Sequence, residues 1–300
     1  MPRPNITMLT LPPRRYRLSA KVDGFETLAE AKAEDRKRAR LLRKDAAKTK
    51  SGWGAMAAAL ADRIDPDLSS HVPVTLASNR YKRRHRRRTV GHVAWVASRR
   101  RDGRICNFTV IRKDWTRHTD TLYGTNLVRI LRQFREDLDR AKATFKRKLL
   151  KRGKPAHKPW DGWIWAEIHG EHEPETDSFP IHVHGVATGD MIEVLDCLRR
   201  QRVYKRWAAD GDIPPAKRPV VLSRKRFFNL LSGIAYNSKS YWPSKRVGLV
   251  KSGAVKKQRF HSRIQNPQHS HVLLFLDQWT LPQITLLYGL TIRNGRLVKS

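Results

Sequence analysis

Apolar residues recur at helical spacing in three segments of the chain. Between residues 125 and 150 they stand three or four positions apart, at Leu127, Ile130, Leu131, Phe134, Leu138, Ala141, Phe145 and Leu149. This spacing predicts an amphipathic helix of about 25 residues. Shorter patterns of the same kind predict helices over residues 190–207 and 223–242, the second with Ser223 as N-cap and Pro243 as its stop.

Four other segments alternate apolar and polar residues or are rich in β-branched and aromatic residues, which predicts strands. Residues 89–98 and 105–112 are joined by a turn that contains Asp-Gly, a hairpin signal. Residues 160–170 and 179–189 are joined by the polar stretch EHEPETDS, so we expect a second antiparallel pair. The apolar segment 271–290 fits either a strand or a helix.

The order of these elements is typical of an α+β protein. It predicts a central antiparallel sheet with helices packed on one face. We expect a basic N-terminal arm and helix over residues 1–88, partly flexible, and a folded domain over residues 89–245. Residues 246–300 are then a C-terminal extension that packs on the domain or follows it.

The N-terminal part is strongly cationic. Residues 1–20 contain four prolines and several arginines and predict an extended basic arm, while residues 26–50 favour helix but have little apolar stripe, as in a solvated helix lying along a nucleic acid. The run NRYKRRHRRR at residues 79–88 fits a solvated linker, a clamp on phosphates or a nuclear-localisation signal, and we favour a linker that also acts as a clamp.

The net charge of the chain indicates which class of partner to expect. The 300 residues include 62 Lys and Arg against 27 Asp and Glu, a formal net charge of +35, and hydrophobic residues make up 39% of the chain. A core is therefore possible, but the excess charge repels itself unless an anion neutralises it, and the phosphate backbone of a nucleic acid is the natural partner. The basic residues are not gathered opposite one large apolar helix face, so a membrane is not expected as a partner.

Cysteine content and hydropathy indicate a soluble intracellular protein of the cytoplasm. The two cysteines, Cys106 and Cys197, make neither a disulfide scaffold nor a CxxC zinc pattern, and we expect two buried or idle thiols. The N-terminus has no apolar signal-peptide core, and no window reaches about 18 uninterrupted apolar residues, the length that a membrane-spanning helix needs.

Two histidines on a predicted strand are candidate metal ligands. In FPIHVHGVATGD, His182 and His184 are two apart and share one face of the strand, as Glu167 and His169 do on the preceding strand. If the pairing joins these faces, imidazoles and a carboxylate converge, a donor set that suits Mn²⁺ or Mg²⁺. An HxH pair alone is also compatible with ordinary surface histidines.

A tyrosine and a lysine downstream are candidate catalytic residues. Tyr236 and Lys239 are three apart and would share a face of the predicted helix. A nearby ammonium group can favour the phenolate or stabilise charge on a scissile phosphate. Tyr241 and Lys245 form a competing pair, but Pro243 between them breaks the helical alignment, which favours Tyr236.

Three segments in this order, CNFTVI, FPIHVHGVA and AYNSK, resemble the motifs of single-tyrosine HUH endonucleases, the rolling-circle replication initiators (Rep proteins) of plasmids and phages. The resemblance covers about residues 90–245. It implies an RRM-like sheet on which the metal and the tyrosine meet. It also implies metal ligation by His182, His184 and Glu167, with His169 on the same face as Glu167. Tyr236 would be the nucleophile and Lys239 its helper.

The resemblance implies nicking and joining of single-stranded or extruded origin DNA through a 5′-phosphotyrosine, which leaves a 3′-hydroxyl that a host polymerase can extend. No GxxxxGK[ST] motif is present, so we expect unwinding by a host helicase. The alternatives are a related transposase or relaxase, a non-catalytic basic nucleic-acid-binding protein, and a metal-dependent hydrolase without a covalent step. Trp163, Trp165 and Trp242 could stack on bases, although core packing is favoured for most of them.

Overall fold

The computed structural model describes residues 6–19, 25–49, 52–100, 102–153, 160–204, 219–223, 227, 229–239, 241–245, 247–249, 255–257 and 262–300. The protein is α+β, as the sequence predicted, and is built on a five-stranded antiparallel sheet with strand order β4-β1-β3-β2-β9. These strands are β1 (Ile105–His118), β2 (Ile164–Gly170), β3 (Ser178–Thr188), β4 (Val220–Ser223) and β9 (Thr285–Tyr288). β1, β2 and β3 confirm three of the four predicted strands.

The helices of the described residues are α1 (Leu28–Lys48), α2 (Gly52–Ile64), α3 (Asn79–Ser98), α4 (Thr119–Leu122), α5 (Leu127–Lys151), α6 (Asp190–Leu198), α7 (Leu230–Ala235), α8 (Gln268–Asp277) and α9 (Leu281–Ile284). α5 confirms the longest amphipathic pattern. The apolar segment 271–290 contains parts or all of α8, α9 and β9 and enters β10, so neither of its two simple interpretations was sufficient.

Three two-stranded sheets complete the described strands. They pair β5 (Pro243–Ser244) with β8 (Ser262–Arg263), β6 (Val247–Leu249) with β7 (Val255–Lys257), and β10 (Leu290–Arg293) with β11 (Arg296–Lys299). Short 3₁₀ turns lie at Ile6–Met8, Arg14–Tyr16, Pro174–Thr176 and Arg202–Tyr204.

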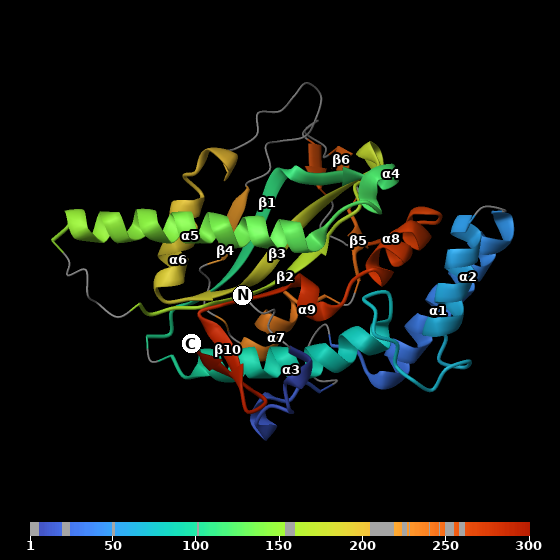
Figure 1. The fold of residues 1–300 in the computed structure, drawn as a ribbon, viewed down its shortest axis with the longest axis horizontal. Coiled ribbons are helices and arrows are strands. Elements are labelled where there is room, and N and C mark those ends of the chain that lie inside the picture. The colour runs from blue at the N-terminus through green and yellow to red at the C-terminus, as the bar shows by residue number, and fades with distance from the viewer. Residues whose placement is uncertain are drawn as a thin grey trace.

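Helices cover both faces of the central sheet, whereas the sequence predicted one covered face (Figure 1). On one face, Phe108 of β1 meets Phe134 of α5, with ring centroids 6.1 Å apart. On the other, Asn107 of β1 bonds to Asn237, which follows α7, and Glu167 of β2 lies in a pocket with Lys82 of α3. The sequence missed the second layer because this face is polar.

The strand predicted over residues 89–98 and the linker predicted over residues 79–88 are both wrong, because the two segments form one continuous helix, α3. The side chain of Ser78 caps it by accepting a hydrogen bond from the backbone of Tyr81. In the second half the alternation of Val90, His92 and Ala94 fits a strand, but Val90, Val93, Ala94 and Ala97 also fit a helix and are all buried. In this case the helical period prevailed.

The cationic run at the start of α3 is largely inside the protein. Arg80 is 4% exposed, and its Nε lies 3.0 Å from the carboxylate of Asp35, itself fully buried in α1. Lys82 and Arg86 are also buried, on the side of α3 that faces the central sheet. These cations therefore serve the fold, since a buried charge needs a partner that offsets its lost hydration.

The described part of the predicted N-terminal arm packs on α3 and is not extended into solvent. Ile6, Leu9 and Leu18 are buried. Gly91 of α3 permits the contact, because a Cβ atom there would lie 2.4 Å from both Pro12 Cγ and the carbonyl oxygen of Tyr16. Residues 1–5 and 20–24 lie outside the described residues.

One cluster of buried side chains includes residues from the predicted N-terminal part (1–88), the predicted domain (89–245) and the predicted C-terminal extension (246–300), among them Ile6, Phe108 and Leu297. A second, smaller cluster joins α1, α2 and α8. Trp163, Trp165 and Trp242 are at most 5% exposed and belong to the main core, as favoured from the sequence. Cys106 and Cys197 are both buried and are not joined in a disulfide. Among the described helices, none is both long enough and apolar enough to cross a membrane.

Candidate functional site

The pairing of β2 with β3 gathers histidines on one face of the sheet. His169 stands opposite His182 and Glu167 stands opposite His184 in the register, so the two predicted faces are the same face. The ring centroids of His182 and His184 are 4.4 Å apart, and that of His169 lies 5.5 Å from His184 and 6.3 Å from His182. The three imidazole rings therefore form one cluster.

Hydrogen bonds orient two of these rings. His182 Nδ1 lies 3.0 Å from the carbonyl oxygen of Pro180, and because a carbonyl only accepts, Nδ1 carries the proton. His184 Nδ1 lies 2.7 Å from Oγ1 of Thr109 on β1. The Nε2 atoms of both histidines are thus left for other partners. Histidines that ligate a metal usually have this arrangement, in which the other ring nitrogen makes a hydrogen bond that orients the ring.

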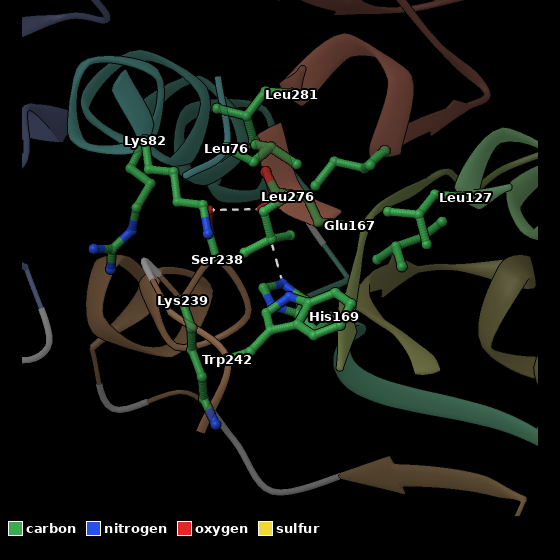
Figure 2. A pocket seen from close by; sticks show the side chains of 13 residues that line it. Leu76, Lys82, Leu127, Glu167, His169, Ser238, Lys239, Trp242, Leu276 and Leu281 are labelled. Atoms are coloured by element: carbon green, nitrogen blue, oxygen red, sulfur yellow. Dashed lines mark hydrogen bonds and ion pairs between the residues drawn. The ribbon is translucent and has the colours of Figure 1, made fainter. Parts of the chain in front are cut away.

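His169 and Glu167 differ in what holds them. His169 is buried, and its Nε2 atom has no hydrogen-bond partner among the described residues. The Glu167 carboxylate accepts a hydrogen bond of 2.9 Å from Ser238 Oγ and lies 3.9 Å from His169 Nε2 (Figure 2). His169 therefore offers an unused nitrogen, while one oxygen of Glu167 is already engaged.

Burial sets the protonation of the cluster. It lowers the pKa of His182 to about 4 and holds the pKa values of His169 and His184 well below the ordinary range, with the charge of Lys239 contributing to all three shifts. The histidines are neutral near pH 7, as metal ligation requires. Burial also raises the pKa of Glu167 to about 7, partly offset by Ser238, Arg86 and Lys82.

The turn that carries Tyr236 and Lys239 is fastened to this same sheet face. Within the helix predicted over residues 223–242, the described residues are helical only in α7, which begins at Leu230, capped by Asn229, and ends at Ala235. Tyr236 and Lys239 therefore lie beyond the end of the observed helix, although the prediction placed them within one. Asn237 Nδ2 donates to Asn107 Oδ1 of β1 at 2.7 Å, and Ser238 bonds to Glu167 of β2. Two consecutive residues of the turn are thus bound to two strands of the sheet.

Tyr236 and Lys239 meet although they do not share a helix. The Lys239 Nζ atom lies 4.6 Å from the centroid of the Tyr236 ring, a cation–π contact. Tyr236 is 55% exposed, and partial burial together with Glu171 and Tyr241 raises its pKa. The ammonium group therefore does not make the phenol acidic, and a phenol in this setting needs a base to take its proton.

The residues around the three histidines fit a divalent cation, but they do not surround one point. Within the part of the chain that the structure describes, no three His, Cys, Asp or Glu side chains already form a metal-binding group. The fit rests on the donor set: three neutral imidazoles, one of them with an unpartnered buried nitrogen, beside a carboxylate.

Several residues of the site were not singled out from the sequence. Lys82 and Arg86 of α3 line the pocket that contains Glu167 and Ser238. Figure 2 shows Lys82 in this pocket, and burial lowers the pKa of Lys82 to about 7. Glu171, which follows β2, pairs with Lys245 Nζ at 2.6 Å. Parity could have found Glu171, since it continues the alternation of Glu167 and His169. Nothing in the basic run of α3 distinguished a buried lysine from an exposed one.

Tyr241, the competing tyrosine, is also exposed, at 45%. Its expected helper Lys245 forms an ion pair with Glu171, whereas Tyr236 has Lys239 over its ring.

Comparison of the chain with protein-family models, with curated proteins and with solved structures finds no match.

Proposed function

We propose that the protein nicks and joins single-stranded DNA by way of a phosphotyrosine on Tyr236, with a divalent cation, Mn²⁺ or Mg²⁺, held by the histidines. The observation that carries the proposal is the hydrogen bond from Ser238 to Glu167. It ties the turn that presents Tyr236 and Lys239 to the sheet face that bears His169, His182 and His184. A tyrosine, an amine and a group of metal-type donors are thereby joined in one structural unit.

In this proposal the Tyr236 oxygen attacks a backbone phosphorus while the bond to the 3′-oxygen breaks. The products are a 5′-phosphotyrosine and a free 3′-hydroxyl, whose oxygen takes a proton from water as it leaves. The phenol proton passes to a base, for which Glu171 is our candidate because its charge acts on Tyr236. Lys239, whose amine lies over the ring, stabilises charge on the phosphate. Joining is the reverse step, with a 3′-hydroxyl attacking the phosphotyrosine.

The ligands that we propose for the cation are His182 and His184, with His169 or Glu167 as the third. The structure favours His169 by leaving its Nε2 unpartnered, and it gives Glu167 a role in holding Ser238. A bound divalent cation supplies Lewis-acid polarisation of the scissile phosphate. Initiation of rolling-circle replication at an origin, with a host helicase and polymerase, is the process that we propose for this chemistry.

Two considerations support single-stranded DNA as the substrate: the net charge of the protein and the access of the Tyr236 hydroxyl to the DNA backbone. The net charge of +35 calls for a polyanion. A tyrosine hydroxyl can reach a backbone phosphorus more readily in an unpaired, bendable strand than in a regular duplex. The RRM-like classification of the fold belongs to the same proposal, since the comparisons with solved structures do not extend it beyond α+β.

The test is incubation of the protein with a pool of single-stranded oligonucleotides of random sequence and Mn²⁺, followed by a denaturing gel. We expect a protein–DNA adduct that survives denaturation, disappears with excess chelator and is absent from the Tyr236→Phe variant. Binding of the pool with no cleavage would support the non-catalytic nucleic-acid-binding protein instead. Cleavage without an adduct would indicate a metal-dependent hydrolase.

A further inference from the structure

The outward face of α1 carries a row of cations. Lys37, Arg40, Lys44 and Lys48 are three or four residues apart, so they lie on one side of the helix, and all four are exposed. The opposite side contains Ala31, Asp35, Ala39 and Leu42 and is buried. Figure 1 shows α1 and α2 side by side at one end of the molecule, with α8 close by. We call these four cations the α1 row.

The α1 row differs from the cations beside it on the same helix. Arg36 pairs with Asp67 at 2.7 Å, and Arg43 pairs with Asp62 at 2.9 Å and with Asp65 at 2.7 Å. No member of the α1 row makes an ion pair with a described residue. Asp62, Asp65 and Asp67 thus form their ion pairs with Arg36 and Arg43, on the flank of α1. Arg40 acts on Asp67 only at a longer range, so the row keeps its capacity to bind an external anion.

The row leads into a cleft with an aromatic wall. The cleft is lined by Asp45, Lys48, Thr49, Trp53, Asn266, Pro267 and His271. The rings of Trp53, on α2, and His271, on α8, have centroids 4.9 Å apart. The one acid in this lining, Asp45, is buried and accepts a hydrogen bond of 2.6 Å from Ser270 Oγ. Lys48 therefore belongs to both the row and the cleft.

We infer that the α1 row and this cleft form a path for single-stranded DNA, apart from the Tyr236 site. Phosphates lie along Lys37, Arg40, Lys44 and Lys48, and a base stacks on Trp53 beside His271. The combination of a cationic track with aromatic platforms is how proteins hold single strands without reading their sequence. The inference rests on the proposed function for the choice of DNA, but it does not require cleavage.

The dimensions and chemistry favour this partner over a membrane or an acidic protein. From residue 37 to residue 48 the helix rises by about 16 Å, enough to contact several consecutive phosphates. No large apolar side chain of α1 is exposed among the four cations, so the helix has nothing to insert into a bilayer. A second cleft, which also includes Trp53 and His271 in its lining, contains Asp120 and Asp177 and no Lys or Arg, so the phosphates are expected in the cleft that contains Lys48.

The test is equilibrium binding of the full chain to labelled oligothymidylate and to a duplex of the same length, over a range of KCl and in excess EDTA, which stops cleavage. One variant changes the four residues of the α1 row to Gln. Its matched control changes four exposed cations of α5, Arg129, Arg132, Lys146 and Lys151, to Gln. Trp53→Ala is compared with Trp53→Phe, which keeps a stacking ring, and circular dichroism checks that each variant folds.

For the α1-row variant we expect the affinity for the single strand to fall by at least about tenfold. The negative slope of the logarithm of the binding constant against the logarithm of the salt concentration should decrease in magnitude by about 3. The α5 control should lose clearly less. Trp53→Ala should bind about tenfold more weakly than Trp53→Phe. Equal losses in the two quadruple variants, or a preference for the duplex, would overturn the inference.

This result is separable from that of the cleavage assay. A protein that forms no phosphotyrosine but binds oligothymidylate through the α1 row keeps this inference and loses the proposed function. A protein that forms the adduct while its α1-row variant binds like the α5 control keeps the function and loses the path.

Discussion

At the residue scale, the site depends on which nitrogen of each histidine is occupied. Thr109 and the carbonyl group of Pro180 engage the Nδ1 atoms of His184 and His182, which leaves both Nε2 atoms available. His169 adds a third nitrogen without a partner among the described residues. Thr109 thus gains a role that the motif CNFTVI alone did not reveal: it positions a ring on the neighbouring strand.

Thr109→Val should therefore weaken binding of Mn²⁺ by about 10-fold to 100-fold, the usual cost of removing an outer hydrogen bond from a metal ligand. Val keeps the shape and the strand propensity, so the fold should persist. Calorimetric titration with MnCl₂ measures the affinity. Thr116→Val, in the same strand and without a described side-chain hydrogen bond, is the control. Unchanged affinity in Thr109→Val would remove Thr109 from the site.

At the element scale, strand parity predicted most of the candidate site. His182, His184, Glu167 and His169 share a face because a strand has a period of two and the hairpin joins equivalent faces. Parity does not say whether Glu167 or His169 is the better donor, because that depends on Ser238, which comes from a distant part of the chain. It also does not reveal Lys82, which reaches the site from α3.

Helices were predicted correctly where the amphipathic pattern continues over many residues, as in α5. They were missed where the apolar residues fit both the helical period and the strand period. α3 is the clear case, since its valines and alanines fit both a strand and a helix, and the arginines before them suggested solvent. Tertiary contacts determine that this segment is a helix: Asp35 of α1 forms an ion pair with Arg80, and Pro12 packs on Gly91. Such partners are far apart in sequence and leave no local pattern.

The link between β1 and the turn after α7 yields a second prediction at this scale. Asn107 Oδ1 accepts from Asn237, and Asn107 Nδ2 donates to the carbonyl group of Gly233 at 3.3 Å. Asn107→Ala should slow adduct formation by about tenfold or more by releasing the turn, with DNA affinity in EDTA little changed. Single-turnover kinetics on denaturing gels measure the rate.

A double-mutant cycle provides the control for this prediction. If the two asparagines act through their shared hydrogen bond, the Asn107→Ala and Asn237→Ala variants should be slowed to a similar extent, and the double variant should be slowed scarcely further. Rates that multiply in the double variant would show that the two residues act independently, and the turn would not be held as described.

At the scale of the whole molecule, the charge of +35 is divided between the fold and the surface. Part of it is internal, as in the pairing of Arg80 with Asp35, and part is exposed, as in the α1 row. The fold also buries histidines away from the site. Burial lowers the pKa of His85 to about 4 and that of His269 to about 3.

Acid should therefore destabilise the protein at a pH where most proteins are stable. Between pH 6.5 and pH 4.5 the unfolded chain protonates His85 and His269 while the folded chain does not, so the free energy of unfolding falls as pH falls. Each such histidine contributes about 1.4 kcal/mol per pH unit at most. Glu167, with its pKa raised to about 7, acts in the opposite direction over this range but is a single group.

Urea unfolding in EDTA at several pH values measures this dependence. His269→Asn should make the free energy of unfolding less dependent on pH, by the contribution of one proton. A free energy of unfolding that is constant from pH 6.5 to pH 4.5 would show that these histidines are solvated in the folded protein.

The central claim, that Tyr236 forms the covalent bond with DNA, can be tested by mapping the adduct. Trypsin cuts after Lys239 and so places Tyr236 and Tyr241 in different peptides. After reaction with single-stranded DNA and Mn²⁺ and digestion with trypsin and nuclease, mass spectrometry should find the nucleotide on the peptide of residues 227–239. The adduct should persist in Tyr241→Phe and vanish in Tyr236→Phe. A nucleotide on the peptide of residues 240–245, or an adduct that survives Tyr236→Phe, would contradict the account.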